Sequence, residues 1–172
     1  MLSDLLLLAP AAIIFVILLL LRLRGRATDA VPPEDTAPRN AIVVDGSNVM
    51  HWGGDPSLDV LARVLRSLEM AGFSPIVFFD ANVGYKVGER YYTEETVAPL
   101  IGVPIDHIVV VDKGVVADEM ILKCATDLGA RIVTQDKFRD WRVRFPHAAK
   151  KGVLVSGKYT NGNVKWARPL KV

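Results

Sequence analysis

Apolar and polar positions alternate along residues 41–172 with two different periods, and this pattern predicts strands and helices in turn. Short runs of β-branched and aromatic residues between turn formers predict buried strands. Longer segments with apolar residues three and four positions apart predict helices that cover those strands. The predicted strands are residues 41–44, 74–80, 107–112, 131–134 and 151–156. The predicted helices are residues 57–71, 91–100, 116–128 and 136–144.

This order of elements predicts an α/β fold. Strand and helix repeated in turn form a mostly parallel central sheet with helices on both faces, which gives a three-layer, Rossmann-like domain. The tail contains the sequence TNGN at residues 160–163. Because Asn-Gly is typical of tight hairpin turns, we expect an antiparallel ribbon to close one edge of the sheet.

The first 24 residues differ, because they are apolar on all sides. The run from Leu5 to Leu21 carries no charge and, at about 17 residues, reaches the lower limit for a helix that crosses a bilayer. Asp4 precedes this run, whereas Arg22, Arg24 and Arg26 follow it. A cleaved signal peptide has the opposite order of charges. We therefore expect a single-pass membrane anchor, with its N-terminus outside and the following domain in the cytoplasm.

Residues 25–40 connect this anchor to the α/β part. Three prolines, mixed charge and the lack of an apolar period are typical of an extended linker. We therefore divide the chain into a transmembrane anchor with a basic flank (1–24), a flexible linker (25–40) and a folded domain (41–172), so that one transmembrane helix precedes the α/β fold.

Composition and charge narrow the classes of function. Hydrophobic residues make up 51% of the chain and mean hydropathy is +0.27, an excess that comes from the leucine-rich start. The net charge is only +2, so a nucleic acid would have to bind to a local basic patch. The single cysteine, Cys124, excludes an internal disulfide and is explained as a small buried thiol on a helix face.

Acidic residues recur where the predicted strands end. They are Asp45 and Asp80 after the first two strands, Asp118 at the start of the helix after the third, and Asp136 and Asp140 after the fourth. Because the carboxyl ends of parallel strands meet at one edge of the sheet, we expect these side chains to gather there. The spacing of Asp136 and Asp140 places both on one face of the predicted helix.

Such a group of carboxylates needs a counter-charge. Two carboxylates about 4 Å apart repel by roughly 4 kcal/mol at an effective dielectric constant near 20. A divalent cation relieves that repulsion, and a site made of oxygen ligands suits Mg²⁺ or Mn²⁺. Each acid also has a structural alternative, because aspartate is common at helix N-termini and in turns.

Three motifs resemble one known family. They are VVDGSNVM (43–50), ADEMIL (117–122) and TQDKFRDW (134–141). In order and approximate spacing they resemble the PIN-like NYN ribonucleases, and above all their Zc3h12a-like (Regnase/MCPIP-type) branch. That branch has a D-G-x-N motif after its first strand, a D-D or D-E pair that opens a central helix, and an S/T-x-D-x-x-x-D motif after its fourth strand. The resemblance covers about residues 41–170 and implies a PIN/NYN fold.

The resemblance also implies a catalytic metal site. It assigns Asp45, Asp118, Asp136 and Asp140 to the binding of Mg²⁺ or Mn²⁺ and to catalysis, with Asn48 as the catalytic residue that supports Asp45. Where relatives often have two adjacent aspartates, this chain has Ala117 before Asp118 and Glu119 after it, so Glu119 is a further candidate. Asp80 is a candidate by topology alone. The expected reaction is hydrolysis of phosphodiester bonds in single-stranded or loop RNA, which leaves a 5′-phosphate and a 3′-hydroxyl.

Candidate RNA-binding residues lie near the same predicted edge. Lys113, Lys137 and Arg139 suit phosphate groups, and Trp52 lies in a loop from which its ring would stack on an unpaired base. RNA and the membrane are therefore the expected partners. A second copy of the chain, giving a homodimer, is a further candidate.

Three other functions stay open on the sequence alone. The same fold without catalysis would be an RNA-binding or scaffold domain at the membrane. A phosphatase of the haloacid dehalogenase type would need a second acid two positions after Asp45, where this chain has Ser47. A dinucleotide-binding domain would need a G-x-G-x-x-G motif after the first strand, and this sequence has none there.

Overall fold

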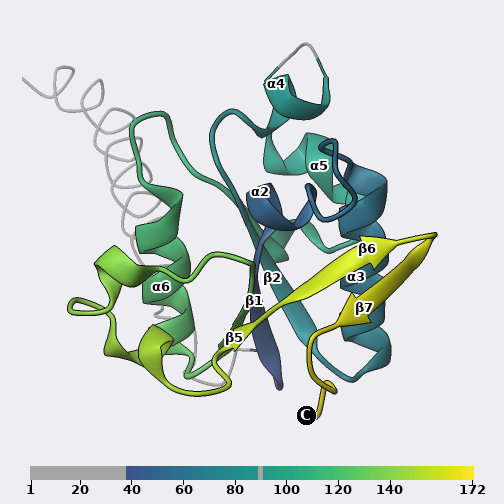
Figure 1. Cartoon of the computed structure of the whole chain (residues 1–172). Helices are drawn as coiled ribbons and strands as arrows, with labels where there is room; N and C mark the ends of the chain where they lie inside the picture. Colours follow the sequence, from purple (N-terminus) through teal and green to yellow (C-terminus); the bar gives the residue numbers. More distant parts are fainter. Residues whose placement is uncertain (1–37, 89–90) are drawn as a thin grey trace, which may run out of the picture. The chain divides into compact units, whose positions relative to one another are not determined.

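Five parallel strands form the central sheet in the order β3-β2-β1-β4-β5 (Figure 1). The computed structural model describes residues 38–88 and 91–172. The strands are β1 (Ala41–Asp45), β2 (Ser74–Phe79), β3 (Ile108–Val110), β4 (Arg131–Val133) and β5 (Leu154–Val155). The predicted α/β fold with a mostly parallel sheet is therefore confirmed.

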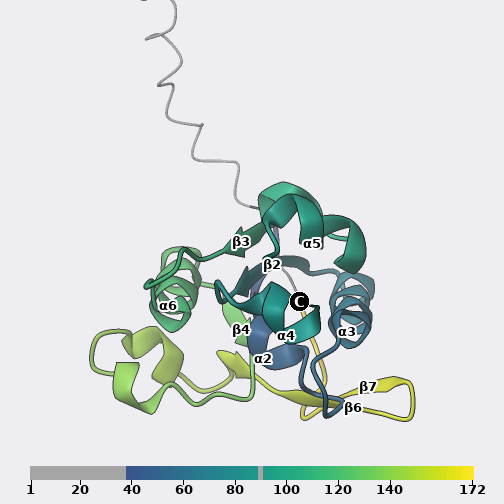
Figure 2. The same cartoon turned by 90° about the horizontal axis from the view of Figure 1, so that it is seen from above.

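Helices cover both faces of this sheet (Figure 2). On one face, α3 (Leu58–Met70) and α5 (Glu94–Ile101) share a core with Val44. On the other face, α6 (Ala117–Asp127) shares a second core with Val43. Successive strand residues point to opposite faces, so two adjacent valines of β1 enter different cores. The three layers expected from the sequence are present.

The amphipathic pattern of α3 explains its place. Ser57 caps its N-terminus, where the Ser57 Oγ accepts a hydrogen bond from the backbone N of Val60 at 3.4 Å. The apolar residues at three- and four-residue spacing are all buried, and they are Val60, Leu61, Val64, Leu65 and Leu68. Gly72, at a φ of 86°, follows the helix end and lets the chain turn back into β2.

Shorter elements complete the domain. They are α2 (Gly46–Val49), α4 (Val83–Val87) and the single 3-10 turns η1 (Ile105–His107), η2 (Arg139–Trp141) and η3 (Pro146–Ala149). Strands β6 (Gly157–Thr160) and β7 (Asn163–Trp166) pair antiparallel, and both turn residues between them have positive φ. The predicted hairpin is confirmed. It forms a two-stranded sheet of its own, however, and does not extend the central sheet as expected.

The prediction of a helix over residues 136–144 was wrong, because the segment contains only the short 3-10 turn η2. Asp136 Oδ1 accepts a hydrogen bond from the backbone N of Phe138 at 2.7 Å, and Phe138 adopts a left-handed conformation with a φ of 44°. This turn buries the Phe138 ring to 2% exposure in the core beside α6. Full burial of such a ring contributes about 2–3 kcal/mol, which offsets the roughly 1–2 kcal/mol of left-handed backbone. Asp136 and Asp140 therefore do not share a helix face.

The membrane anchor predicted for residues 1–24 lies outside the described residues, as does most of the linker predicted for residues 25–40. In the part of the chain that is described, no helix is both long enough and apolar enough to cross a bilayer.

Candidate active site

A buried carboxylate lies where β1 and β4 end side by side. Asp45 is 8% exposed; its Oδ1 accepts a hydrogen bond from the backbone N of Asn48 at 3.0 Å, and its Oδ2 accepts one from the Thr134 hydroxyl at 2.9 Å. The pKa of Asp45 is raised to about 6, mainly by burial; the two hydrogen bonds oppose this rise, and the charges of Asp118 and Asp80 add to it. A carboxyl group perturbed in this way is typical of functional sites.

Other acids approach Asp45 from neighbouring elements. Asp118 lies in the first turn of α6. Burial raises its pKa, and the charges of Asp136 and Asp80 raise it as well, whereas a hydrogen bond from Trp141 lowers it. The structure thus brings Asp118 within electrostatic reach of Asp45, Asp80 and Asp136, and Asp45 within reach of Asp80 as well. They come from the ends of β1, β2 and β4 and from the start of α6, the edge that the sequence predicts.

These carboxylates do not converge on one point. Within residues 38–88 and 91–172, no group of three or more His, Cys, Asp and Glu side chains is arranged to hold a metal ion. Asp140 is exposed on η2, and it does not contribute to the pKa shifts of Asp45 and Asp118. Glu119, the candidate substitute acid, forms an ion pair with Arg144 at 2.5 Å.

Asn48 fastens the loop after β4 to the end of β1. Its side-chain oxygen accepts a hydrogen bond from the backbone N of Gln135 at 3.0 Å and a second one from the indole N–H of Trp52 at 3.2 Å. Asn48 therefore supports Asp45 through its backbone N–H, whereas its side chain positions the loop that carries Asp136.

Gly46 and Ser47 fasten the end of β2 in a similar way. A Cβ at Gly46 would lie 2.7 Å from the Phe79 ring and 2.9 Å from the carbonyl oxygen of Phe78, so a side chain there has no room. Ser47 Oγ accepts a hydrogen bond from the backbone N of Asp80 at 2.9 Å. The D-G-S-N sequence therefore holds the ends of three adjacent strands in register.

Thr134 is a site residue that the sequence argument did not single out. Its side chain is 1% exposed, and its hydroxyl donates to Asp45 Oδ2 and accepts a hydrogen bond from the backbone N of Asp136 at 3.0 Å. One hydroxyl thus links two of the acids. The signal for it was the threonine of the T-x-D sequence, which precedes Asp136 by two positions.

Comparison with known families agrees with this geometry. The family model described as the Zc3h12a-like Ribonuclease NYN domain matches residues 38–154, more than half of the chain. The chain belongs to this family. No curated protein shows a significant match to the chain.

Two solved structures share the fold of this NYN domain. The nuclear proteinaceous RNase P 2 (PRORP2) from A. thaliana has a TM-score of 0.56 at 22% identity, over 76% of this chain and 30% of that chain. Another structure of the Arabidopsis thaliana nuclear protein-only RNase P 2 has a TM-score of 0.60 at 21% identity, over 86% of this chain and 35% of that chain. The chain therefore spans about a third of the length of these proteins, and the likeness is one of fold.

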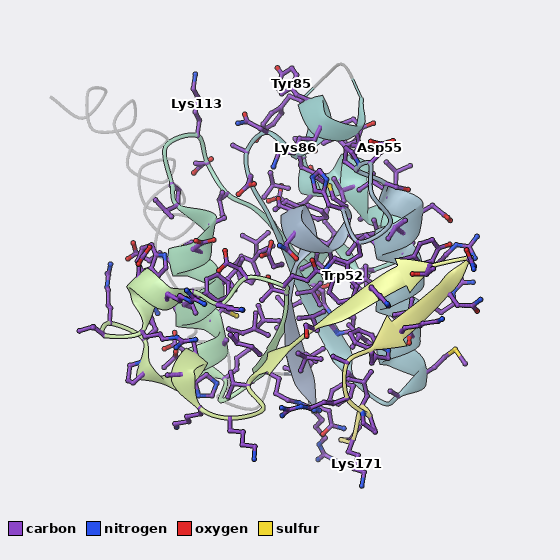
Figure 3. The ribbon with its side chains drawn as sticks, in the orientation of Figure 1. Trp52, Asp55, Tyr85, Lys86, Lys113 and Lys171 are labelled. Carbon is purple, nitrogen blue, oxygen red and sulfur yellow. The ribbon has the colours of Figure 1, made fainter. Side chains whose placement is uncertain are left out.

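The predicted RNA-binding residues of the NYN domain differ in exposure. Lys113 is exposed and extends from the loop between β3 and α6 (Figure 3), and Lys137 and Arg139 are exposed at η2. The prediction for Trp52 was wrong, because its ring is 6% exposed and packs edge-on against Trp166 with 5.8 Å between ring centroids. A ring buried in this way offers no face to a base.

The donor atoms of the NYN domain fit a hard divalent cation. All of them are carboxylate oxygens. Burial is the main cause of the raised pKa of Asp45, and a bound cation would relieve the repulsion from Asp118 and Asp80 that adds to it. Mg²⁺ is usually bound by one or two carboxylates and keeps several waters, so it does not require three converging side chains. On the β2 side, Lys86 already pairs with Asp80 at 3.0 Å, which leaves Asp45, Asp118 and Asp136 as the better donors.

Proposed function

We propose that the chain is a metal-dependent ribonuclease that hydrolyses phosphodiester bonds in single-stranded or loop RNA. One observation carries this proposal: in a chain of a ribonuclease family, a buried Asp45 with a raised pKa lies within electrostatic reach of Asp118 and Asp80. Asp45, Asp118 and Asp136 would hold Mg²⁺ or Mn²⁺, with Asp140 as a further ligand. Membership of the family favours this function over a phosphatase or a dinucleotide-binding domain.

The residues of the chain supply the positioning. When bound, the cation would neutralise the scissile phosphate and lower the pKa of the attacking water. Thr134 and the backbone N–H of Asn48 hold the Asp45 carboxylate in one orientation. Asp118, in the first turn of α6, would complete the ligands of the cation or orient the attacking water. Fixed groups of this kind lower the barrier because attack in line with the leaving oxygen depends on alignment.

We propose that Lys113, Lys137 and Arg139 bind phosphates on either side of the scissile bond. All three are exposed near the carboxyl edge of the sheet. Contacts of this kind are independent of base sequence and weaken as salt is added, so RNA binding should be salt-sensitive.

We also propose that residues 1–24 anchor this ribonuclease to a membrane, N-terminus outside, with the NYN domain in the cytoplasm. Support comes from the uncharged run Leu5–Leu21 and the arginines after it. Protease added outside intact cells should leave the NYN domain uncut, and digestion of the domain would contradict this orientation. The homodimer stays a prediction, which sedimentation velocity would test.

The deciding experiment is a Mg²⁺ titration of RNA cleavage by the unmodified chain and by Asp136→Asn. The unmodified chain should cleave single-stranded RNA with Mg²⁺ and be inactive in EDTA, and Asp136→Asn should lower kcat/KM by about 10²-fold or more. Asp127→Asn is the matched control, because Asp127 is exposed and pairs with Lys123 on α6; it should leave cleavage unchanged.

A non-catalytic RNA-binding domain is the second candidate. The lack of three converging metal ligands among the described residues favours it. RNA binding without cleavage under any divalent metal would support this candidate and reject the ribonuclease. Cleavage that Asp136→Asn leaves intact would reject the proposed acidic site.

A further inference from the structure

A basic groove runs along the outer edge of β5. It is a hollow of about 480 Å³ between β5 with the segment before it and the residues that follow β7. Five of its lining residues are cations, namely Arg131, Arg142, Lys150, Lys151 and Arg168. None of the described lining residues is acidic.

A second hollow, of about 390 Å³, adjoins this groove. The two hollows share Ser156 and Ala167 as lining residues, and the second adds Lys158 and Lys165 from the β6–β7 hairpin. Gln135, the residue before Asp136, also lines this second hollow. The two hollows therefore adjoin at Ser156 and Ala167, and we call them together the path; its lining residues extend from Gln135, next to the candidate active site, to the β5 edge.

Gln135 joins this path to the acidic site through two hydrogen bonds. Its backbone N donates to Asn48 Oδ1 at 3.0 Å, and its side-chain amide donates to the carbonyl oxygen of Gly157 at 2.8 Å. The hairpin that forms one wall of the path is thus attached to the loop that carries Asp136.

The residues that line this path carry much more positive charge than the chain as a whole. The five cations of the first hollow and the two of the second make seven, whereas the formal net charge of the chain is +2. The four ion pairs found among the described residues involve none of the seven. Such a local excess of positive charge attracts a polyanion even when the net charge is small.

Some of these cations have structural contacts and others are free to bind. The Arg131 guanidinium donates to the carbonyl oxygen of Lys171 at 2.6 Å and lies 4.6 Å from the centre of the Phe73 ring. Lys150, Lys151 and Arg168 are exposed, and in the described part of the chain their side chains form no hydrogen bond or ion pair. These three are the phosphate-binding candidates.

We propose that this groove binds the phosphates of the RNA strand on one side of the scissile bond, from Gln135 to the β5 edge. The inference rests on the proposed ribonuclease function and names the part of the substrate that the groove would hold. Proteins that bind single strands typically use a positively charged groove along the backbone. A bilayer surface is flat and would contact protruding cations, whereas these line a recess that leads to the acids, so RNA is the ligand that fits.

The test compares the full chain with a Lys150→Ala/Lys151→Ala variant in EDTA, using single-stranded RNA of about 16 nucleotides. The affinity of the variant should be about tenfold lower at physiological salt. The slope of log K against log salt should fall by about 1.4, because each lost contact to a single-strand phosphate removes about 0.7. Arg168→Ala, on the opposite wall, should act in the same direction.

The matched control is Arg63→Ala/Lys123→Ala. It removes the same two positive charges from exposed ion pairs on α3 and α6, away from the groove. Its RNA affinity should change by about twofold or less, since exposed charges beyond about 10 Å are screened. With Mg²⁺ added, the groove variant should raise KM more than it lowers kcat, as expected of groups that bind substrate away from the reacting atoms.

The outcomes separate the groove from the ribonuclease. Equal RNA affinity of the groove and control variants, or no RNA binding by the unmodified chain, would overturn the groove proposal. Cleavage by the unmodified chain would stand independently of that result. Loss of RNA binding in the groove variant, with no cleavage by the unmodified chain, would reject the ribonuclease and support the groove. If the groove variant lost binding to vesicles of anionic phospholipid and kept its RNA affinity, the groove would be a membrane site and the proposal would be wrong.

Discussion

The protein around Asp45 favours the neutral form of its side chain. The pKa is about 6 in the folded chain, against 3.8 for an ordinary aspartate, mainly because of burial. As pH rises, the unfolded chain therefore loses this proton before the folded chain does. The folded state loses stability between about pH 4 and pH 6, by about 3 kcal/mol at most, and stays at that lower level above pH 6.

The variant Asp45→Asn tests this linkage in EDTA. An amide can keep both contacts, with its oxygen accepting from the Asn48 backbone and its nitrogen donating to Thr134, and it never ionises. The free energy of unfolding should rise by about 1–3 kcal/mol at pH 8 relative to the unmodified chain, with little or no gain at pH 4. Urea denaturation at both values measures it. An equal change in the free energy of unfolding at pH 4 and at pH 8 would contradict the raised pKa.

The Thr134 hydroxyl gives a second prediction at this scale. Thr134→Val keeps the shape of the side chain but leaves Asp45 Oδ2 and the backbone N of Asp136 without their hydrogen-bond partner. We expect a loss of about 1–3 kcal/mol in urea denaturation and a further rise in the pKa of Asp45, because the hydroxyl lowers it. Thr134→Ser retains the hydroxyl and should stay close to the unmodified chain.

Sequence reasoning found acids more readily than the residues that hold them. Asp45 stands out because a carboxylate ends an apolar run. Thr134 does not stand out, because threonine is common in strands and its hydroxyl becomes informative only when β4 lies beside β1. Trp52 was misjudged for a related reason: its position in a loop says nothing of the Trp166 ring that covers it, which comes from more than a hundred residues further along the chain.

Among the elements, α2 depends on its first residue. A Cβ at Gly46 would meet both the Phe79 ring and a backbone oxygen of β2 at less than 3.0 Å. Gly46→Ala should therefore push α2 away from β2 and lower the free energy of unfolding by about 1–3 kcal/mol. The control is Gly53→Ala, whose Cβ would lie 3.2 Å from the movable side chain of Val60. Thermal unfolding of both variants measures the difference, and equal losses would contradict the close approach.

Elements with strong periodicity were predicted well, and those decided by tertiary contacts were not. The pattern of α3 is long and amphipathic, so its bounds agree with the prediction to within a residue or two. The segment 136–144 has acids at helical spacing, but the side chain of Asp136 turns the backbone and Phe138 enters the core instead. The core that buries this ring is formed by α6 together with the central sheet, so local periodicity does not reveal it.

At the scale of the described domain, the unpaired negative charge predicts a response to cations. Bound Mg²⁺ would stabilise the folded chain by relieving the repulsion among Asp45, Asp118 and Asp136, by about 2.7 kcal/mol when free Mg²⁺ is 100 times its Kd. The melting temperature at neutral pH should rise with added Mg²⁺ and return in EDTA. Asp45→Asn should reduce that rise, whereas Asp127→Asn should not. A melting temperature that does not change when Mg²⁺ is added would contradict the proposed metal site.

The sequence predicts that the strands of the sheet are mostly parallel, but it does not predict the order in which they lie side by side. Alternating strands and helices indicate parallel pairing, yet they do not say that β1 lies between β2 and β4. That central position matters, because it brings the ends of β2 and β4 to either side of Asp45. The gathering of acids at one edge follows from parallel pairing, whereas the contact between Asp45 and Thr134 follows from the order.

The attachment of the β6–β7 hairpin has a practical consequence for fragments. The match to the family ends at residue 154, ahead of the hairpin, but Trp166 covers Trp52 and the backbone N of Tyr159 donates to the carbonyl oxygen of Trp52. Truncation at that boundary would remove Trp166 and expose the indole ring of Trp52. Because the Trp52 indole donates to the side chain of Asn48, which in turn holds the loop that carries Asp136, the truncation would loosen that loop. A clone that ended at the family boundary would lack the last eighteen residues of the chain, and any activity measured with it would be lower than that of the full chain.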